Sequence, residues 1–337
     1  MIYLKDIDYR VIFILLILLL ITFFYEKISE KLKLYDIPNS KRKIHNEPTS
    51  IINGFIVLIC INIYFVFDYL MFKEFDTKFS IIIIVLVNIF YLLGYYDDLK
   101  DLSPKKKTFI IVVILFLSIP FDENLVLKSL IFKDLINTQI YLNNFFIFIT
   151  IFFIYIFYNF LNFIDGINGV ALSVCIYFLF IQGFERGVYL NFEILIIITL
   201  LLCLILNLKN ISFLGNSGIS ALSILISLSY IREYNINQTL LCDEIFLIYL
   251  IPGIDMTRLV FSRIISGKSI SDADLNHLHH YFLNFVDKKY VFIVYLIASI
   301  IPYLISKFLT DYLFVILISV TLYSLILIIL TRMPKKI

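Results

Sequence analysis

An acidic cluster at the end of an apolar stretch is the part of the chain whose residue types most clearly suggest chemistry. Asp97 and Asp98 are adjacent and Asp101 follows about one helical turn later, just after the apolar residues 79–96. Carboxylates crowded together near hydrocarbon are costly to desolvate, so such a cluster usually has a partner. The natural partner is a divalent cation, and a phosphate group can accompany it. The alternative is a solvated loop that merely ends an apolar helix.

The composition is that of a membrane protein. The 337 residues are 61% hydrophobic and 16% charged, with a mean hydropathy of +0.95, whereas soluble domains are about half apolar and about a quarter charged. The four cysteines lie singly in apolar stretches, so we expect small core residues and no zinc site. The first apolar run lacks a small-residue cleavage site and is therefore predicted to be an uncleaved span.

Eleven apolar segments approach the roughly 20 residues that a bilayer span needs. They are residues 9–25, 51–72, 79–96, 108–121, 144–164, 166–184, 189–206, 217–231, 239–261, 290–309 and 312–330. The fourth and the eighth are short, which leaves ten spans as the alternative. No soluble domain fits between the segments. The sequence therefore predicts an all-α, polytopic membrane protein that forms a single integral membrane domain over residues 1–337.

The Lys and Arg residues orient these predicted helices. With the N-terminus outside, the inner loops carry about twice as many Lys and Arg residues as the outer loops, in agreement with the positive-inside rule. Five unusual polar segments then fall on the cytoplasmic side. They are residues 36–45, 97–107, 159–169, 213–218 and 272–280. We therefore expect one site on the cytoplasmic face, assembled from several helix ends.

The third of these segments ends in a carboxylate. Asp165 follows an unbroken apolar run and is flanked by Gly166 and Gly169, and Asn162 lies about one helical turn earlier. Polar residues at this spacing in a membrane helix are expensive unless they line a cavity. Hydrogen bonding between helices, with a glycine-containing turn, is the alternative.

The fifth segment holds three of the four histidines of the chain, His277, His279 and His280. Their imidazoles could donate hydrogen bonds to phosphate oxygens. The i, i+2 spacing does not stack two rings on one helical face, so we expect a loop or a short amphipathic helix. No nearby cysteine completes a tetrahedral zinc site. The alternative is a surface loop with titrating histidines.

Together, the motifs resemble those of the polyprenyl-phosphate N-acetylhexosamine-1-phosphate transferases (glycosyl transferase family 4). The resemblance runs from about Asp36 to His280 and is nearest to the bacterial undecaprenyl-phosphate GlcNAc-1-phosphate transferases. The motifs, in chain order, are Asp-x-Pro-Asn…Arg-Lys-x-His, Gly-x-x-Asp-Asp-x-x-x-Leu-Ser-Pro, Asn-x-x-Asn-x-x-Asp-Gly-x-x-Gly, Phe-x-Gly-x-x-Gly and His-x-His-His.

The resemblance implies an enzyme of the bacterial inner membrane. Such enzymes transfer N-acetylhexosamine-1-phosphate from a UDP-sugar to undecaprenyl phosphate and release UMP, which starts a cell-surface polysaccharide such as lipopolysaccharide or a cell-wall polymer. They need Mg²⁺ or Mn²⁺. The partners implied are the two substrates and the lipid bilayer, with a homodimer as one arrangement and no nucleic acid.

The resemblance also implies roles for individual residues. The expected catalytic residues are Asp97, Asp98 and Asp165. The expected metal ligands are Asp97, Asp98, Asp165 and Asn216. The expected substrate-binding residues are Asn162, Lys107, His277, His279, His280 and His45.

The chain departs from the family pattern at several positions. Asn216 stands where the family has an aspartate that binds the metal, and Asn168 stands where it has a second aspartate. Asparagine keeps a carbonyl oxygen but loses the charge that hard divalent ions prefer. Two hypotheses follow, an active transferase and a catalytically impaired homologue that binds polyprenyl phosphate or glycan-assembly partners. A transporter is a third, weaker idea, since the polar groups do not lie at the membrane midplane.

Overall fold

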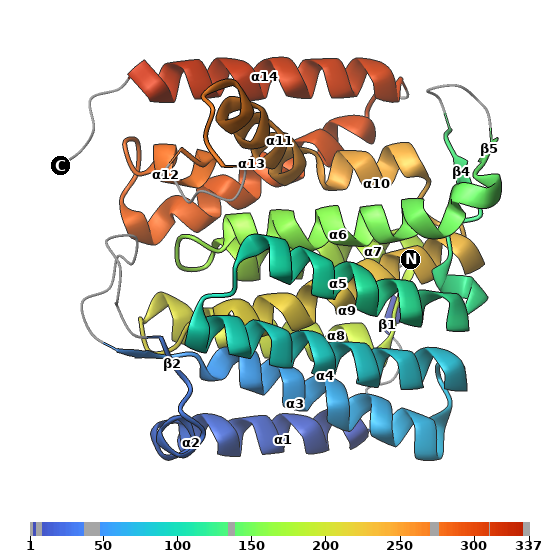
Figure 1. Cartoon of the computed structure of the whole chain (residues 1–337), viewed down its shortest axis with the longest axis vertical. Coiled ribbons are helices and arrows are strands. Elements are labelled where there is room, and N and C mark those ends of the chain that lie inside the picture. The colour runs from blue at the N-terminus through green and yellow to red at the C-terminus, as the bar shows by residue number, and fades with distance from the viewer. Residues whose placement is uncertain are drawn as a thin grey trace.

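The structure is a computed structural model, and it describes residues 3–4, 9–36, 48–133, 139–269, 276–309 and 311–332. It is a bundle of helices, as the sequence predicts (Figure 1). The helices are α1 (Tyr9–Phe23), α2 (Tyr25–Leu32), α3 (Ile52–Phe67), α4 (Thr77–Lys100), α5 (Pro104–Ser118), α6 (Phe146–Ile164), α7 (Val170–Arg186), α8 (Asn191–Leu208), α9 (Gly215–Ile236), α10 (Cys242–Ile248), α11 (Leu250–Ile265), α12 (Leu278–Phe282), α13 (Val291–Ser306) and α14 (Tyr312–Arg332).

Strands are few and short. They form three two-stranded pairs, of which β1–β6 is parallel and the other two are antiparallel. Their bounds are β1 (Tyr3–Leu4), β2 (Tyr35–Asp36), β3 (Thr49–Ser50), β4 (Ser129–Ile131), β5 (Gln139–Tyr141) and β6 (Val188–Tyr189). A π-helical turn (Asp68–Phe72) extends α3, and short 3₁₀ turns lie at Ile119–Phe121, Glu123–Leu125, Asn143–Phe145 and Lys288–Tyr290.

Each of the eleven expected segments contains a helix, but fewer helices are long and apolar enough to cross a membrane. Among the described residues there are six, at Ile52–Phe72, Thr77–Lys100, Asn143–Ile164, Asn191–Leu208, Lys288–Ser306 and Tyr312–Arg332. The pairs α1–α2 and α10–α11 raise the number to eight if each bent pair is one span, with bends of 76° and 74°. The chain is thus an all-α, multi-pass membrane protein, and the count of eleven spans is not confirmed.

Helix α9 lies at the centre of the bundle, where it packs against α3, α4, α6 and α7. Most of its residues are buried, and serines recur along it at Ser217, Ser220, Ser223 and Ser227. Small side chains let neighbouring helices approach closely. Buried hydroxyls need partners in such surroundings, and Ser223 Oγ donates to the carbonyl of Ile219, one turn earlier, at 2.7 Å.

The close approach depends on glycines. A Cβ built on Gly94 of α4 would lie 2.7 Å from the Cα of Ser217 in α9, and one on Gly54 of α3 would lie 3.0 Å from the Cα of Gly218. Real Cβ atoms do not come this near to backbone atoms, so only glycine fits. Helices α3 and α4 are therefore held directly against the first turn of α9.

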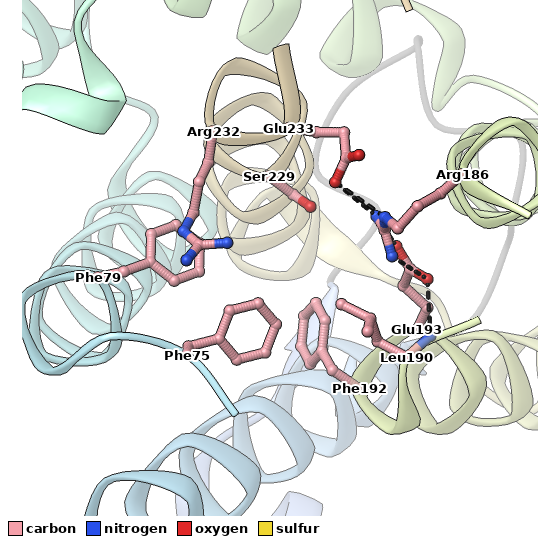
Figure 2. A pocket seen from close by; sticks show the side chains of 9 residues that line it. All are labelled: Phe75, Phe79, Arg186, Leu190, Phe192, Glu193, Ser229, Arg232 and Glu233. Atoms are coloured by element: carbon pink, nitrogen blue, oxygen red, sulfur yellow. Dashed lines mark hydrogen bonds and ion pairs between the residues drawn. The ribbon is translucent and has the colours of Figure 1, made fainter. Parts of the chain in front are cut away.

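The end of α9 is held by buried ion pairs. Arg186 of α7 lies between two carboxylates, 2.7 Å from Glu193 of α8 and 2.9 Å from Glu233 of α9 (Figure 2). The adjoining pocket, which Phe75 and Phe192 also line, has a volume of about 20 Å³, room for roughly one water molecule. It is too small for an organic substrate. We therefore assign this cluster to holding three helices together.

Candidate functional site

The acidic segment 97–107 is a helix–turn–helix. Helix α4 ends because Asp101 adopts a left-handed conformation (φ 46°), and Pro104 begins α5. The turn brings Lys107, in the first turns of α5, back to Asp97, where its ammonium lies 2.8 Å from Oδ2. Asp97 Oδ1 accepts the backbone N–H of Leu102 at 2.7 Å. Both oxygens of Asp97 thus have partners within the segment.

Asp98 faces the start of α9 instead. Its carboxylate accepts the backbone N–H groups of Asn216 and Ser217 at 3.0 and 3.1 Å, which are free donors at a helix N-terminus. A Cβ on Gly215 would lie only 3.1 Å from Asp98 Oδ2, so the glycine leaves room for the carboxylate. The Asn216 side chain is half-buried. The second and fourth polar segments therefore meet through Asp98.

The third segment forms the loop between α6 and α7. Asn168 Nδ2 donates to the carbonyl oxygen of Asn207 at 2.9 Å and to Asn210 Oδ1 at 2.7 Å. Both partners are acceptors, so position 168 needs a donor, which an aspartate carboxylate lacks. The departure from the family pattern at Asn168 thus has a structural reason. Among the residues that the structure describes, nothing explains the change at Asn216.

The histidine segment lies against this loop. A Cβ on Gly166 would lie 2.6 Å from His279 Nε2 and 3.3 Å from His280 Nε2, so the two imidazoles sit directly over the backbone beside Asp165. As expected from the spacing, the histidines do not share one helical face: His277 precedes the short helix α12, and its ring lies nearly parallel to that of His279 (15°, centroids 5.2 Å apart). The third and fifth polar segments therefore also meet.

Asp165 is a carboxylate with no attractive partner in the part of the chain that the structure describes. Its side chain is exposed at the surface, although dense protein surrounds the position. Desolvation by the surrounding protein, followed by the charges of Asp98 and Asp36, raises the pKa of Asp165, and water at the exposed side chain moderates the shift. Three carboxylates near enough to repel one another favour a bound cation.

The donor set fits a weakly held divalent ion and not a preformed cage. No three His, Cys, Asp or Glu side chains within the described ranges come close enough to hold a metal ion. Mg²⁺ usually takes only one or two protein carboxylates and fills its other positions with water and substrate phosphates. Asp165 and Asp98, with the amide oxygen of Asn216, could supply such ligands. Asp97 fits this role less well, because Lys107 already neutralises it.

The described parts of the polar segments gather at one end of the bundle. The α4–α5 turn, β2 and α12 lie there, whereas β4, β5 and α10 lie at the other end (Figure 1). Residues 80–233 match the family model described as glycosyl transferase family 4.

This segment belongs to glycosyl transferase family 4.

The match supports the resemblance over these residues, and members of this family are phosphoglycosyl transferases that act on polyprenyl phosphate with a UDP-sugar as donor. Members of glycosyl transferase family 4 typically depend on Mg²⁺. No curated protein matches the chain. The matched residues include the second, third and fourth polar segments, and both the first segment and the histidine segment lie outside them.

The remaining predicted site residues take varied positions. Asn162 is half-buried in the last turn of α6. The ammonium of Lys107 also lies 5.4 Å from the centre of the Tyr158 ring, which ties α5 to α6. His45 lies outside the described residues, as do the acidic residues 272 and 274 that precede the histidines.

Sequence reasoning missed two charged residues of α11. Asp255 and Arg258 lie within the apolar segment 239–261, where they form an ion pair at 2.9 Å. Ionisable residues inside a membrane segment suggest a functional or structural partner, and this signal was present in the sequence. The structure shows the partner to be the histidine segment.

Proposed function

We propose that the chain transfers N-acetylhexosamine-1-phosphate from a UDP-sugar to undecaprenyl phosphate and releases UMP. In this proposal the chain is a single domain of the bacterial inner membrane, with the N-terminus outside and the site on the cytoplasmic face. The product would start a cell-surface polysaccharide. The observation that carries the proposal is that the histidine segment lies directly over Gly166, beside Asp165, while Asp98 lies near enough for its charge to act on Asp165.

The reaction exchanges one phosphoanhydride partner for another. An oxygen of the lipid phosphate forms a bond to the phosphorus that carries the sugar, and the bond from that phosphorus to the oxygen of the nucleoside phosphate breaks. The bonding electron pair leaves with UMP. Both reactants are anions, so the site must offset their repulsion and hold them in line.

In this proposal, different residues bind the two substrates and the cation. The histidines would donate to phosphate oxygens of the nucleotide sugar, and Lys107 would face the lipid phosphate while Asp97 orients it. Asp98, Asp165 and Asn216 would hold Mg²⁺ or Mn²⁺. When bound, the cation supplies positive charge that stabilises the phosphate oxygens.

Release of UMP tests the proposal directly. Purified protein with Mg²⁺, undecaprenyl phosphate and a panel of UDP-N-acetylhexosamines should release UMP with at least one donor, and the release should stop when the lipid phosphate is omitted. Absence of UMP with every donor would contradict the proposal.

The second candidate function is a catalytically impaired homologue, and Asn216 favours it. Replacing Asn216 with Asp should raise the affinity for Mg²⁺ by about tenfold or more, since affinity at oxygen sites grows with the charge of the ligands. Without Mg²⁺ the same change should lower the midpoint of thermal unfolding, because a further carboxylate would lie on the residue whose backbone N–H binds Asp98. The Mg²⁺-dependent shift of that midpoint measures both effects.

Asn168→Asp is the matched control. It also restores an aspartate of the family pattern, but it should destabilise the protein without raising Mg²⁺ affinity, because two carbonyl oxygens face that position. If Asn216→Asp leaves a robust rate of UMP release unchanged, the impaired-homologue hypothesis is ruled out. If the wild-type rate of UMP release is very low and Asn216→Asp raises it strongly, the impaired-homologue hypothesis is supported.

A further inference from the structure

Asp255 of α11 is buried and contacts its own helix and two other parts of the fold, α12 and α14. It accepts a hydrogen bond from Arg258 at 2.9 Å and one from the Tyr323 hydroxyl of α14 at 2.8 Å. Both of its oxygens lie 3.2 Å from the backbone nitrogen of Leu278, the first residue of α12. Only 1% of Asp255 is exposed, so these donors fix the carboxylate in one orientation.

The same carboxylate reaches the first histidine. His277 Nδ1 lies 3.4 Å from Asp255 Oδ2, and the edge of the ring packs against Phe163 of α6, with ring centres 5.5 Å apart. A carboxylate at this distance favours a proton on the facing imidazole nitrogen and restrains the ring by charge attraction, although no hydrogen bond joins the two within the described residues. Asp255 therefore holds both the side chain of His277 and the backbone that follows it.

The ring of His277 also affects the orientation of the other two histidines, because the three rings are in contact. The His277 ring stacks on that of His279, and the ring centres of His279 and His280 lie 4.4 Å apart. Both ring nitrogens of His279 are buried and lack a hydrogen-bond partner within the described residues. Burial, followed by the charges of the neighbouring histidines, holds the pKa of His279 well below its usual range. Within the described residues its ring is held by packing, against His277 on one side and Tyr295 of α13 on another.

Arg258 strengthens this arrangement from the other side. Besides Asp255, it donates to the backbone carbonyl of Asn276 and, from Nε, to the Tyr323 hydroxyl at 2.9 Å. The segment that leads into the histidines is therefore clamped to α11 and α14 through one buried carboxylate and its arginine. The rings of His279 and His280, which follow this segment, lie over Gly166, beside Asp165.

We propose that Asp255 is a positioning residue for the histidine segment, which sets the ring of His277 and through it the rings that face Gly166. The effect on sugar-nucleotide binding rests on the proposed function, whereas the effect on the imidazoles does not. Asp255 itself does not touch a substrate in this proposal. Its removal should change how the histidines are presented, and leave the acidic segment 97–107 unaltered.

Two measurements on the full-length protein in detergent test the proposal. The chain has only four histidines, so ¹⁵N-histidine NMR gives four sets of imidazole signals. Asp255→Asn should shift the signals of His277 and of at least one of its two neighbours, with His45 unchanged. By analogy with the loss of an outer-shell partner at metal sites, the KM for the UDP-sugar should rise about 10- to 100-fold, while the KM for the lipid phosphate stays the same.

Asp243→Asn is the matched control. Asp243 is also buried, on α10 of the same bent pair, and it accepts the backbone N–H of Lys133 at the opposite end of the bundle. It should leave the histidine signals and both KM values unchanged. Tyr323→Phe removes one hydrogen-bond donor from Asp255 without removing a charge. It should shift the His277 signal by a smaller amount than Asp255→Asn does, and it serves as the test if Asp255→Asn fails to fold.

Unchanged histidine signals in folded Asp255→Asn, or in Tyr323→Phe if only that variant folds, would overturn the proposal. So would a parallel rise of both KM values, which indicates a general loss of structure. If the wild-type protein released no UMP with any donor, the proposed function would fail, but the NMR measurement would still decide the role of Asp255.

Discussion

Asp98→Asn should abolish the release of UMP. The carboxylate accepts two backbone N–H groups at the start of α9, and an asparagine amide can accept from one of them only by turning its NH₂ group toward the other. The variant also removes a charge that would hold the cation beside Asp165. Removal of a preorganised electrostatic contact at a reacting centre typically costs about 10²–10³ in rate, so we expect a loss of at least this size in a UMP-release assay with Mg²⁺ and undecaprenyl phosphate.

Asp101→Asn is the control for this prediction. Asp101 belongs to the same acidic cluster, but it is exposed and adopts a left-handed conformation that asparagine tolerates well. It should keep the wild-type rate. The thermal unfolding midpoint of each variant shows whether it is folded. Full activity in folded Asp98→Asn would remove Asp98 from the catalytic residues.

Gly94→Ala should destabilise the fold and inactivate the protein together. The added methyl would lie 2.7 Å from the Cα of Ser217 and closer still to the backbone of Asn216. Backbone atoms of a central helix cannot move aside cheaply, and overpacking typically costs about 1–3 kcal/mol, occasionally more. Helix α9 must shift away from α4, which also separates Asp98 from its two N–H donors. A lower midpoint of thermal unfolding in detergent is the measurement.

Gly253→Ala provides the comparison. Gly253 lies inside α11, and a Cβ there would meet no atom within 4 Å. Because alanine has the higher helix propensity, this variant should be at least as stable as the wild type. Equal midpoints for Gly94→Ala and the wild type would show that α4 and α9 are not packed as closely as described.

The number of spans shows where sequence reasoning stops. Hydropathy located every helix of the bundle core, because apolar runs and helices coincide in a membrane protein. It marked the segment of α5 as short, but it did not foresee that α7 has only 17 residues or that α10 and α11 meet at a bend of 74°. Helix ends and bends depend on local caps and on neighbouring helices, which a running average over residues does not include.

Asn168 and Asp255 show the same limit at the site. In the sequence, Asn168 is only a departure from a family pattern. The structure gives the reason for an asparagine there, since its amide donates to the backbone oxygen of Asn207 and to the side-chain oxygen of Asn210. Asp255 lies in an apolar stretch, and its partners are 23 residues away at Leu278 and 68 residues away at Tyr323. A hydrogen bond between distant segments becomes visible only once packing brings the segments together.

By itself, the sequence determined the membrane character, the helical class, the order of the polar motifs and the family, because each depends on residue types along one stretch of chain. The acidic pair at the end of α4 was recognisable for the same reason. Only the tertiary structure decided that Asp97 pairs with Lys107 whereas Asp98 binds the N-terminus of α9. Adjacent residues on a helix point about 100° apart, so the two carboxylates face different neighbours, and those neighbours are set by how the helices pack.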